Sequence, residues 1–175
     1  MALNKEFLQH QLQRSAEDFI KIILPLTEQQ FEQNLKGKWS AGQDLAHLTK
    51  TLRVIGLGFR LPLGIFKLLY GTANRPSRVY EEFSARYEEK MEGGIQAPSY
   101  VLPPKVSYGD RDKLRNKLMK QTAFLVRKAE AMSEQDLDRY IVPHPLFGKI
   151  TMREMFMATW LHTDHHTALL KRKLG

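Results

Sequence analysis

Apolar residues recur at intervals of three and four along four stretches of the chain, which is the spacing that gathers them on one face of an α-helix. In the first stretch these residues are Phe7, Leu8, Leu12, Phe19, Ile20 and Ile23. The pattern predicts four long helices, over residues 4–24, 40 to 56 or 58, 110–132 and 151–174. Ser40 and Thr151 are each followed three residues later by Gln or Glu, the capping-box spacing that marks a helix start. Thr27 has the same spacing and predicts a short helical turn.

A connection of about fifty residues, 59–109, separates the second long helix from the third. It contains an amphipathic piece over residues 77–91, followed by two glycines and a proline-rich stretch. Connections of this length in compact domains are usually functional covers or crossovers. The strand signal is weak along the whole chain, and is best at residues 140–142, before Pro143. We therefore expect one all-α domain over residues 1–175, a four-helix bundle whose crossover 59–109 forms a lid or a pocket wall.

The composition limits which side chains can bind a metal ion, and the start of the chain bears on where in the cell the protein is expected. The 175 residues include no cysteine, so any metal must be held by imidazole or oxygen, and any thiol chemistry must use a thiol brought by a substrate. The start of the chain lacks an apolar signal core, which predicts a cytoplasmic protein. The apolar stretch 54–70 is interrupted by charges and a proline, and falls short of a spanning helix. Its alternative interpretation is a helix that lies on a membrane surface.

The net charge of +8 raises the question of nucleic-acid binding. The basic residues of stretch 110–131 scatter around the helix and form no stripe, so we expect neither a nucleic-acid nor a membrane partner. A basic rim could still attract a small anionic substrate.

Three histidines are the candidate metal ligands. His162 and His166 are four residues apart, so on a helix they lie roughly 40° apart around the axis and about 6 Å apart along it. His47 lies on a second predicted helix, and none of the three is at a helix end. Two imidazoles from one helix and a third from another would form a facial set with open coordination positions, as in catalytic metal sites.

The other candidates each have two interpretations. His10 is expected at the surface, and His144 is either a plain loop residue or part of a pocket mouth. His165 points away from the His162 and His166 pair, which indicates a supporting or surface role. Asp44 and Asp164 are candidates for orienting a ligand imidazole, or are ordinary surface acids. No second catalytic group can be named from the sequence.

Three segments resemble the DinB/YfiT-like family of metal-binding four-helix bundles: residues 38–48 around Trp39-Ser40, residues 143–151, and His162-Thr163-Asp164-His165-His166. The resemblance implies that His47, His162 and His166 bind a divalent ion such as zinc or nickel, and that the protein forms a homodimer. Relatives in that family include transferases that use low-molecular-weight thiols and a thiol-dependent isomerase. The connection 59–109 is longer than is usual there, so the substrate class does not carry over.

These observations predict a metal-dependent enzyme for a small-molecule substrate, either a low-molecular-weight-thiol transferase or a hydrolase. The alternative is a non-catalytic protein, one that binds metal for structure or that meets a partner under stress. A structural ion generally has four protein ligands. Three evident ligands favour an open position and therefore chemistry.

Overall fold

The four predicted long helices are present in the computed structural model, which describes residues 3–34, 37–94 and 96–175. They are α1 (Lys5–Ile23), α3 (Ala41–Gly58), α6 (Arg111–Ala131) and α8 (Met152–Leu174). The turn predicted at Thr27 is the short helix α2 (Glu28–Glu32). Capping boxes at Thr27, Ser40 and Thr151 start α2, α3 and α8, as their spacing predicts. Of the expected domain 1–175, residues 1–2, 35–36 and 95 lie outside the described residues.

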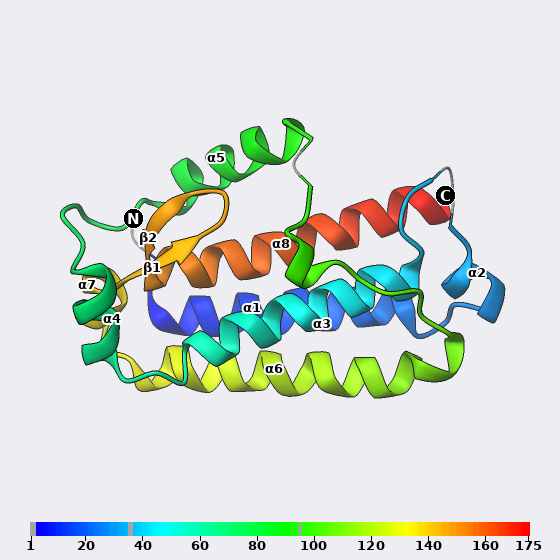
Figure 1. The fold of residues 1–175 in the computed structure, drawn as a ribbon, viewed down its shortest axis with the longest axis horizontal. Helices are drawn as coiled ribbons and strands as arrows, with labels where there is room; N and C mark the ends of the chain where they lie inside the picture. The colour runs from blue at the N-terminus through cyan, green and yellow to red at the C-terminus, as the bar shows by residue number, and fades with distance from the viewer. Residues whose placement is uncertain (1–2, 35–36, 95) are drawn as a thin grey trace.

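The long helices form a four-helix bundle with a crossover, which confirms the predicted architecture (Figure 1). Helix α1 packs against α6 and α8, and α3 packs against α6. The crossover carries the chain back to the end of the bundle where α3 began, so α3 and α6 run in the same direction and α8 runs opposite to both (Figure 1). Helices α3 and α8 contact each other much less extensively. The space between these two helices is where polar side chains can enter the bundle.

The bundle interior is filled by large apolar side chains from all four long helices. Those with almost no exposed surface are Leu8, Phe19, Ile23, Leu45, Leu48, Leu118, Leu125, Phe156 and Trp160. At one end, Phe31 of α2 packs directly on Gly42 in the first turn of α3, where an added Cβ would lie 2.6 Å from the ring. This contact places the start of α3, and with it the helix face that carries His47.

The crossover is partly helical. It contains α4 (Leu63–Tyr70), α5 (Tyr80–Glu92) and two 3₁₀ turns, η1 (Ser99–Val101) and η2 (Tyr108–Asp110). Helix α5 corresponds to the amphipathic piece expected at residues 77–91 and lies along α8 (Figure 1). Glu154 is buried in the first turn of α8. Its carboxylate accepts two hydrogen bonds from the Arg75 guanidinium, at 2.7 and 2.8 Å, and one from the Arg78 guanidinium, at 3.1 Å. Both arginines precede α5 in the chain. These contacts hold the crossover on the start of α8.

A small hairpin precedes α8. The short helix α7 (Glu134–Arg139) leads into β1 (Ile141–His144), which pairs antiparallel with β2 (Gly148–Thr151) so that Val142 faces Ile150. The sequence predicted that Pro143 ends the strand, but Pro143 lies inside β1. Both strands of a two-stranded sheet are edge strands, and an edge strand tolerates a residue without a backbone N–H. Gly148 has a φ of 68°, the left-handed conformation that the turn requires. The hairpin adds to the helical bundle without changing its architecture.

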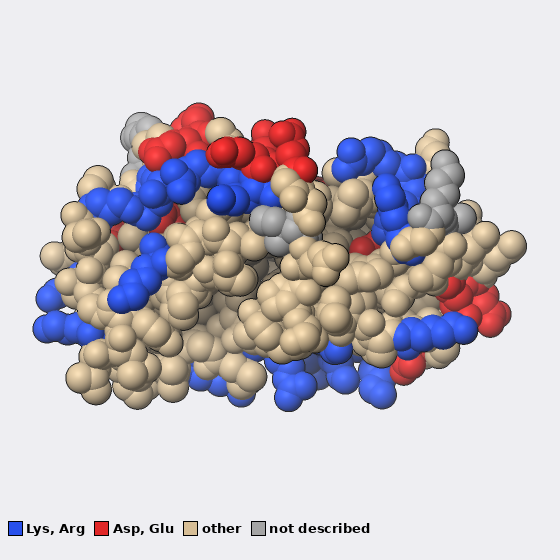
Figure 2. Space-filling model, turned by 45° about the horizontal axis from the view of Figure 1, so that its top comes forward, with Lys and Arg blue, Asp and Glu red and all other residues tan. Residues whose placement is uncertain are grey.

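The stretch 54–70 is divided between the end of α3 and α4, and no helix in the described part of the chain is long and apolar enough to cross a membrane. Phe59 and Phe66 from this stretch are buried in the core, whereas Leu68 and Leu69 are exposed. Figure 2 shows Lys and Arg side chains at several places on the visible face and Asp and Glu side chains gathered over α5. The acidic residues exposed on α5 are Glu81, Glu82, Glu88, Glu89 and Glu92.

Candidate metal centre

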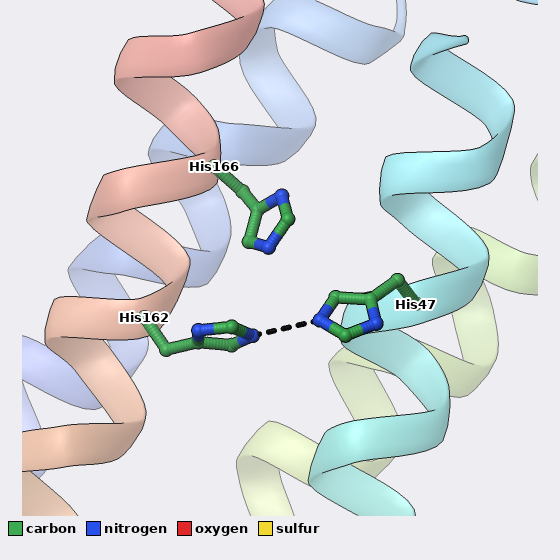
Figure 3. A group of neighbouring side chains, drawn as sticks. All are labelled: His47, His162 and His166. Atoms are coloured by element: carbon green, nitrogen blue, oxygen red, sulfur yellow. Dashed lines mark hydrogen bonds between the residues drawn. The ribbon is translucent and has the colours of Figure 1, made fainter. Parts of the chain in front are cut away.

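The three predicted histidines meet between α3 and α8. One ring nitrogen from each of His47, His162 and His166 lies within 4.8 Å of the other two. The Nε2 atoms of His47 and His162 are 2.9 Å apart, and His166 directs its ring toward the same point from the next turn of α8 (Figure 3). The convergence of distant imidazoles, on which the sequence-based metal site depends, is present in the fold.

The donor set fits a metal ion. Two nitrogen ligands about 2.0–2.1 Å from a zinc ion, at angles of about 90–110°, stand roughly 2.9–3.4 Å apart. The 2.9 Å between His47 and His162 lies at the lower end of that range. Two nitrogen lone pairs this close repel each other unless a cation or a proton lies between them. The arrangement therefore suits a shared cation.

Each imidazole is also held from outside, through its Nδ1 atom. His47 Nδ1 lies 3.0 Å from the carbonyl oxygen of Val101, which can only accept, so this nitrogen carries the proton. His166 Nδ1 lies 3.0 Å from Asp44 Oδ1, and His162 Nδ1 lies 3.1 Å from the Tyr87 hydroxyl. The Val101 carbonyl and the Asp44 carboxylate accept, so Nδ1 of His47 and of His166 is protonated and Nε2 presents its lone pair inward, the tautomer that a metal ligand needs. The Tyr87 hydroxyl can either accept from or donate to His162 Nδ1, and it accepts in the tautomer that turns a His162 Nε2 lone pair inward.

Asp44 is the best anchored of these outer partners. Its carboxylate is almost fully buried and also accepts a hydrogen bond from Lys173 Nζ at 2.5 Å, while the same ammonium donates to the Trp39 carbonyl at 2.9 Å. Burial raises the pKa of the Asp44 carboxyl, and the hydrogen bond from Lys173 opposes that shift. Lys173 thus favours the charged carboxylate that orients His166.

The surroundings keep the three imidazoles neutral. Burial lowers the pKa of His47, and burial together with the charges of neighbouring histidines lowers the pKa of His162 and His166 well below the ordinary value. Because metal binds the neutral imidazole, protons do not compete for these nitrogens near pH 7. In the contact with Asp44, the neutral His166 ring accordingly donates its Nδ1–H to the carboxylate.

One side of the cluster is closed by Trp39, the residue before the α3 cap. Its ring stacks parallel to His166 at 6.2 Å between centroids and lies 4.9 Å from the ring of His47. His47 and His166 are almost fully buried, whereas His162 keeps some exposed surface. Trp39 therefore covers the two more buried rings, and His162 is the least buried histidine of the cluster.

The other candidate residues differ in whether they contact the three histidines. Asp44 orients His166 as proposed, but Asp164 does not contact a ligand histidine and instead pairs with Arg14 at 2.6 Å. His165 is half-buried beside His166, with the two ring centroids 5.7 Å apart, and its role stays a prediction. His10 is exposed, as expected.

His144 lies in β1 and not in a loop, and its ring packs 4.8 Å from that of Phe147. The Leu146 backbone N–H donates to its Nδ1 at 3.1 Å. Burial lowers the pKa of His144 to about 4, so its ring is neutral at pH 7.

Sequence reasoning missed two outer partners, Tyr87 and the Val101 carbonyl. Both belong to the crossover 59–109, which thus forms one wall of the centre. Lys50 on α3 fixes this wall by donating to the Leu102 carbonyl at 2.6 Å. Tyr87 was visible only as an apolar position of an amphipathic helix, and a backbone carbonyl has no signature in the side-chain pattern.

Comparison with solved structures supports the same fold. YfiT from Bacillus subtilis, described as a probable metal-dependent hydrolase with an unusual four-helix bundle topology, matches with a TM-score of 0.64 and 18% identity, covering 98% of this chain and 87% of YfiT. An uncharacterized protein from Clostridium difficile 630 matches with a TM-score of 0.54 and 10% identity, covering 98% of this chain and 96% of that one. None of the curated proteins matches the chain. The DinB superfamily model matches residues 11–170, nearly the whole bundle, and the chain therefore belongs to the DinB superfamily.

Proposed function

We propose that His47, His162 and His166 bind one divalent metal ion, zinc or nickel, and that the protein is a metal-dependent hydrolase of a small molecule. The observation that supports the proposal is the hydrogen bonding of the Nδ1 atoms, because each of the three has a partner outside the cluster and the Nε2 atoms are left facing one another. Three protein ligands leave coordination positions for a substrate, unlike the four ligands of a structural zinc site. The likeness to YfiT, a probable metal-dependent hydrolase, supports the reaction class.

A divalent ion held by three neutral imidazoles keeps its two positive charges, with which it can acidify a bound water or thiol and polarise a carbonyl. The chain's own residues supply the rest. Asp44 and the Val101 carbonyl fix the orientation of His166 and His47, and Trp39 shields these two rings from water. His162 is the least buried of the three histidines.

A low-molecular-weight-thiol transferase is the second candidate. The absence of cysteine suits it, because no internal thiolate competes for the ion and the attacking thiol would come from solvent. Both candidates require the same metal centre and differ in the attacking group.

Metal content tests the centre itself. Untagged protein should contain about one divalent ion per chain by elemental analysis, and His47→Ala and His162→Ala should each lose it. The matched control is His10→Ala, which removes an exposed histidine from α1 and should keep the ion. Retention of metal by both site variants would end the proposal.

Activity then separates the candidates. Turnover of esters or amides without added thiol supports the hydrolase, and conjugation of an electrophile only in the presence of a small thiol supports the transferase. A metal-loaded protein that turns over neither panel points to the non-catalytic alternative. The homodimer implied by the family resemblance is proposed as well, and light scattering on the same sample tests it.

A further inference from the structure

An exposed apolar surface, here called the α3–α4 surface, spans the end of α3, the turn after it and α4. Its members are large apolar side chains that are open to solvent: Val54, Leu57, Leu61, Ile65, Leu68 and Leu69. Leu68 is 84% exposed and Leu69 is 58% exposed, although leucine is usually buried. An apolar surface that gathers several such side chains marks a site of contact with a partner or a membrane.

Helix α4 has one apolar face toward the bundle and another toward solvent. Phe66 is buried in the core and fixes the inner face. Ile65, Leu68 and Leu69 are three and four residues apart, so they share a second face of the helix, and all three are exposed. The outer face therefore contributes nothing to the core of this chain.

The charges that border the α3–α4 surface are positive. The segment 45–80 contains six lysines and arginines and no aspartate or glutamate. Arg53, Arg60 and Lys67 are exposed among the apolar side chains, and Lys149 donates to the last carbonyl of α4 at 3.1 Å. In Figure 2 the left end of the molecule, where α4 lies in Figure 1, shows mainly uncharged and basic side chains, whereas acidic side chains gather over α5. The surface thus suits a partner that is both apolar and anionic.

Charge also decides between the possible partners. In a symmetric dimer built on this surface the same patch of both copies would meet, and Arg53, Arg60 and Lys67 of one copy would lie near those of the other. A bilayer with anionic lipids instead offers phosphate groups to the cations and an acyl layer to the leucines. A bilayer also accepts a protruding side chain such as Leu68 without a matching pocket.

We propose that the α3–α4 surface binds the surface of a lipid bilayer that contains anionic phospholipids. Leu68 and Leu69 insert at the boundary between headgroups and acyl chains, and the neighbouring cations meet the phosphate groups. Helix α4 has eight residues, so it lies in the plane of the membrane and does not cross it. The proposal takes up the alternative interpretation of stretch 54–70 over the expectation of no membrane partner, and it is independent of the metal centre.

Sedimentation with lipid vesicles tests the proposal. The wild type should bind vesicles of phosphatidylcholine with about 30% phosphatidylglycerol, and should bind pure phosphatidylcholine at least about tenfold more weakly. Leu68→Gln combined with Leu69→Gln leaves the net charge unchanged and should weaken binding to the anionic vesicles about tenfold or more. The matched control is Leu24→Gln, an exposed leucine between α1 and α2 at the other end of the bundle, which should bind like the wild type (Figure 1).

A second pair of variants tests the charges. Arg53→Gln combined with Lys67→Gln should weaken binding to anionic vesicles about tenfold, and salt should weaken wild-type binding in the same assay. Lys21→Gln combined with Lys171→Gln removes the same charge from the last turns of α1 and α8 and should change binding less than about threefold. All substituted side chains are exposed, so each variant should keep the wild-type urea midpoint of unfolding.

Three results would overturn the proposal. The first is a wild type that does not bind anionic vesicles, or that binds both vesicle types equally. The second is a folded Leu68 and Leu69 variant that binds anionic vesicles like the wild type. The third is a wild-type dimer, measured by light scattering, that this variant converts to a monomer, because a second copy of the chain would then cover the surface. None of these results bears on metal binding, which is measured separately.

Discussion

Replacing Asp44 by asparagine tests whether the outer hydrogen bonds serve the metal. The Asp44 carboxylate joins His166 Nδ1 at 3.0 Å to Lys173 Nζ at 2.5 Å, and it is almost fully buried. Asparagine has the same shape and retains one acceptor oxygen for His166, but it cannot carry the negative charge. The substitution therefore removes only the negative charge of Asp44, which makes the His166 imidazole a stronger metal ligand.

The expected loss follows from two contacts. Removing the outer partner of a metal-ligating histidine typically weakens metal binding 10–100-fold, which corresponds to about 1.4–2.8 kcal/mol. Asparagine keeps an acceptor, so we expect the lower end, about tenfold weaker zinc binding. In the metal-free protein the weakened bond to Lys173 should lower the free energy of unfolding by about 1–3 kcal/mol. The loss stays within this range because Lys173 keeps its hydrogen bond to the Trp39 carbonyl.

Zinc affinity is measured by competition with a chromophoric chelator at pH 7.5, and stability by urea unfolding of the metal-free protein. The matched control is Asp164→Asn on α8, which removes a half-exposed partner of Arg14 and touches no ligand histidine. That variant should bind zinc normally and change the free energy of unfolding by less than about 1 kcal/mol. Zinc affinity of Asp44→Asn within twofold of the wild type, or an equal loss in both variants, would refute the reasoning.

Three further variants test other parts of the molecule. Tyr87→Phe removes a neutral hydrogen bond to His162 and should weaken zinc binding about 2–10-fold in the same competition assay; unchanged affinity would remove Tyr87 from the centre. Glu154→Gln removes a fully buried carboxylate charge whose partner Arg75 is partly exposed, and should lower the free energy of urea unfolding by about 1–3 kcal/mol; an unchanged free energy would contradict this. For His144 the folded pKa of about 4 lies below the ordinary 6.5, so its contribution to stability is complete above about pH 6.5 and is lost as the pH falls toward 4. Urea unfolding of metal-free protein at pH 7 and pH 5 should show that His144→Gln lacks up to about 1.4 kcal/mol per pH unit of this dependence, and an unaltered pH dependence would count against it.

Much of the bundle could be predicted because its signals are local. The caps at Ser40 and Thr151 depend on residues three positions apart, and the structure places the starts of α3 and α8 there. The hairpin was harder to predict, because β2 has four residues and ends at the threonine that also caps α8. Four residues are too few for a strand periodicity to emerge.

The candidate metal centre was also predictable only in part. The pairing of His162 with His166 could be predicted from helix geometry, and His47 could be predicted as the third imidazole because it lies on a helix with a clear cap. Which acid supports them depends on how helices are rotated in the bundle, so Asp44 and Asp164 were equivalent in sequence, yet only Asp44 contacts an imidazole.

The origin of the outer hydrogen bonds has a consequence for redesign of this scaffold. The partner of His166 belongs to α3, whereas the partners of His47 and His162 come from η1 and α5 of the crossover. A graft that exchanges residues 59–109 for another loop would leave all three imidazoles on their helices. It would remove the hydrogen-bond partner of Nδ1 from two of them, His47 and His162. Any such chimera must therefore supply a new hydrogen-bond partner for each of these rings, because without one the protonation of their nitrogens is not defined.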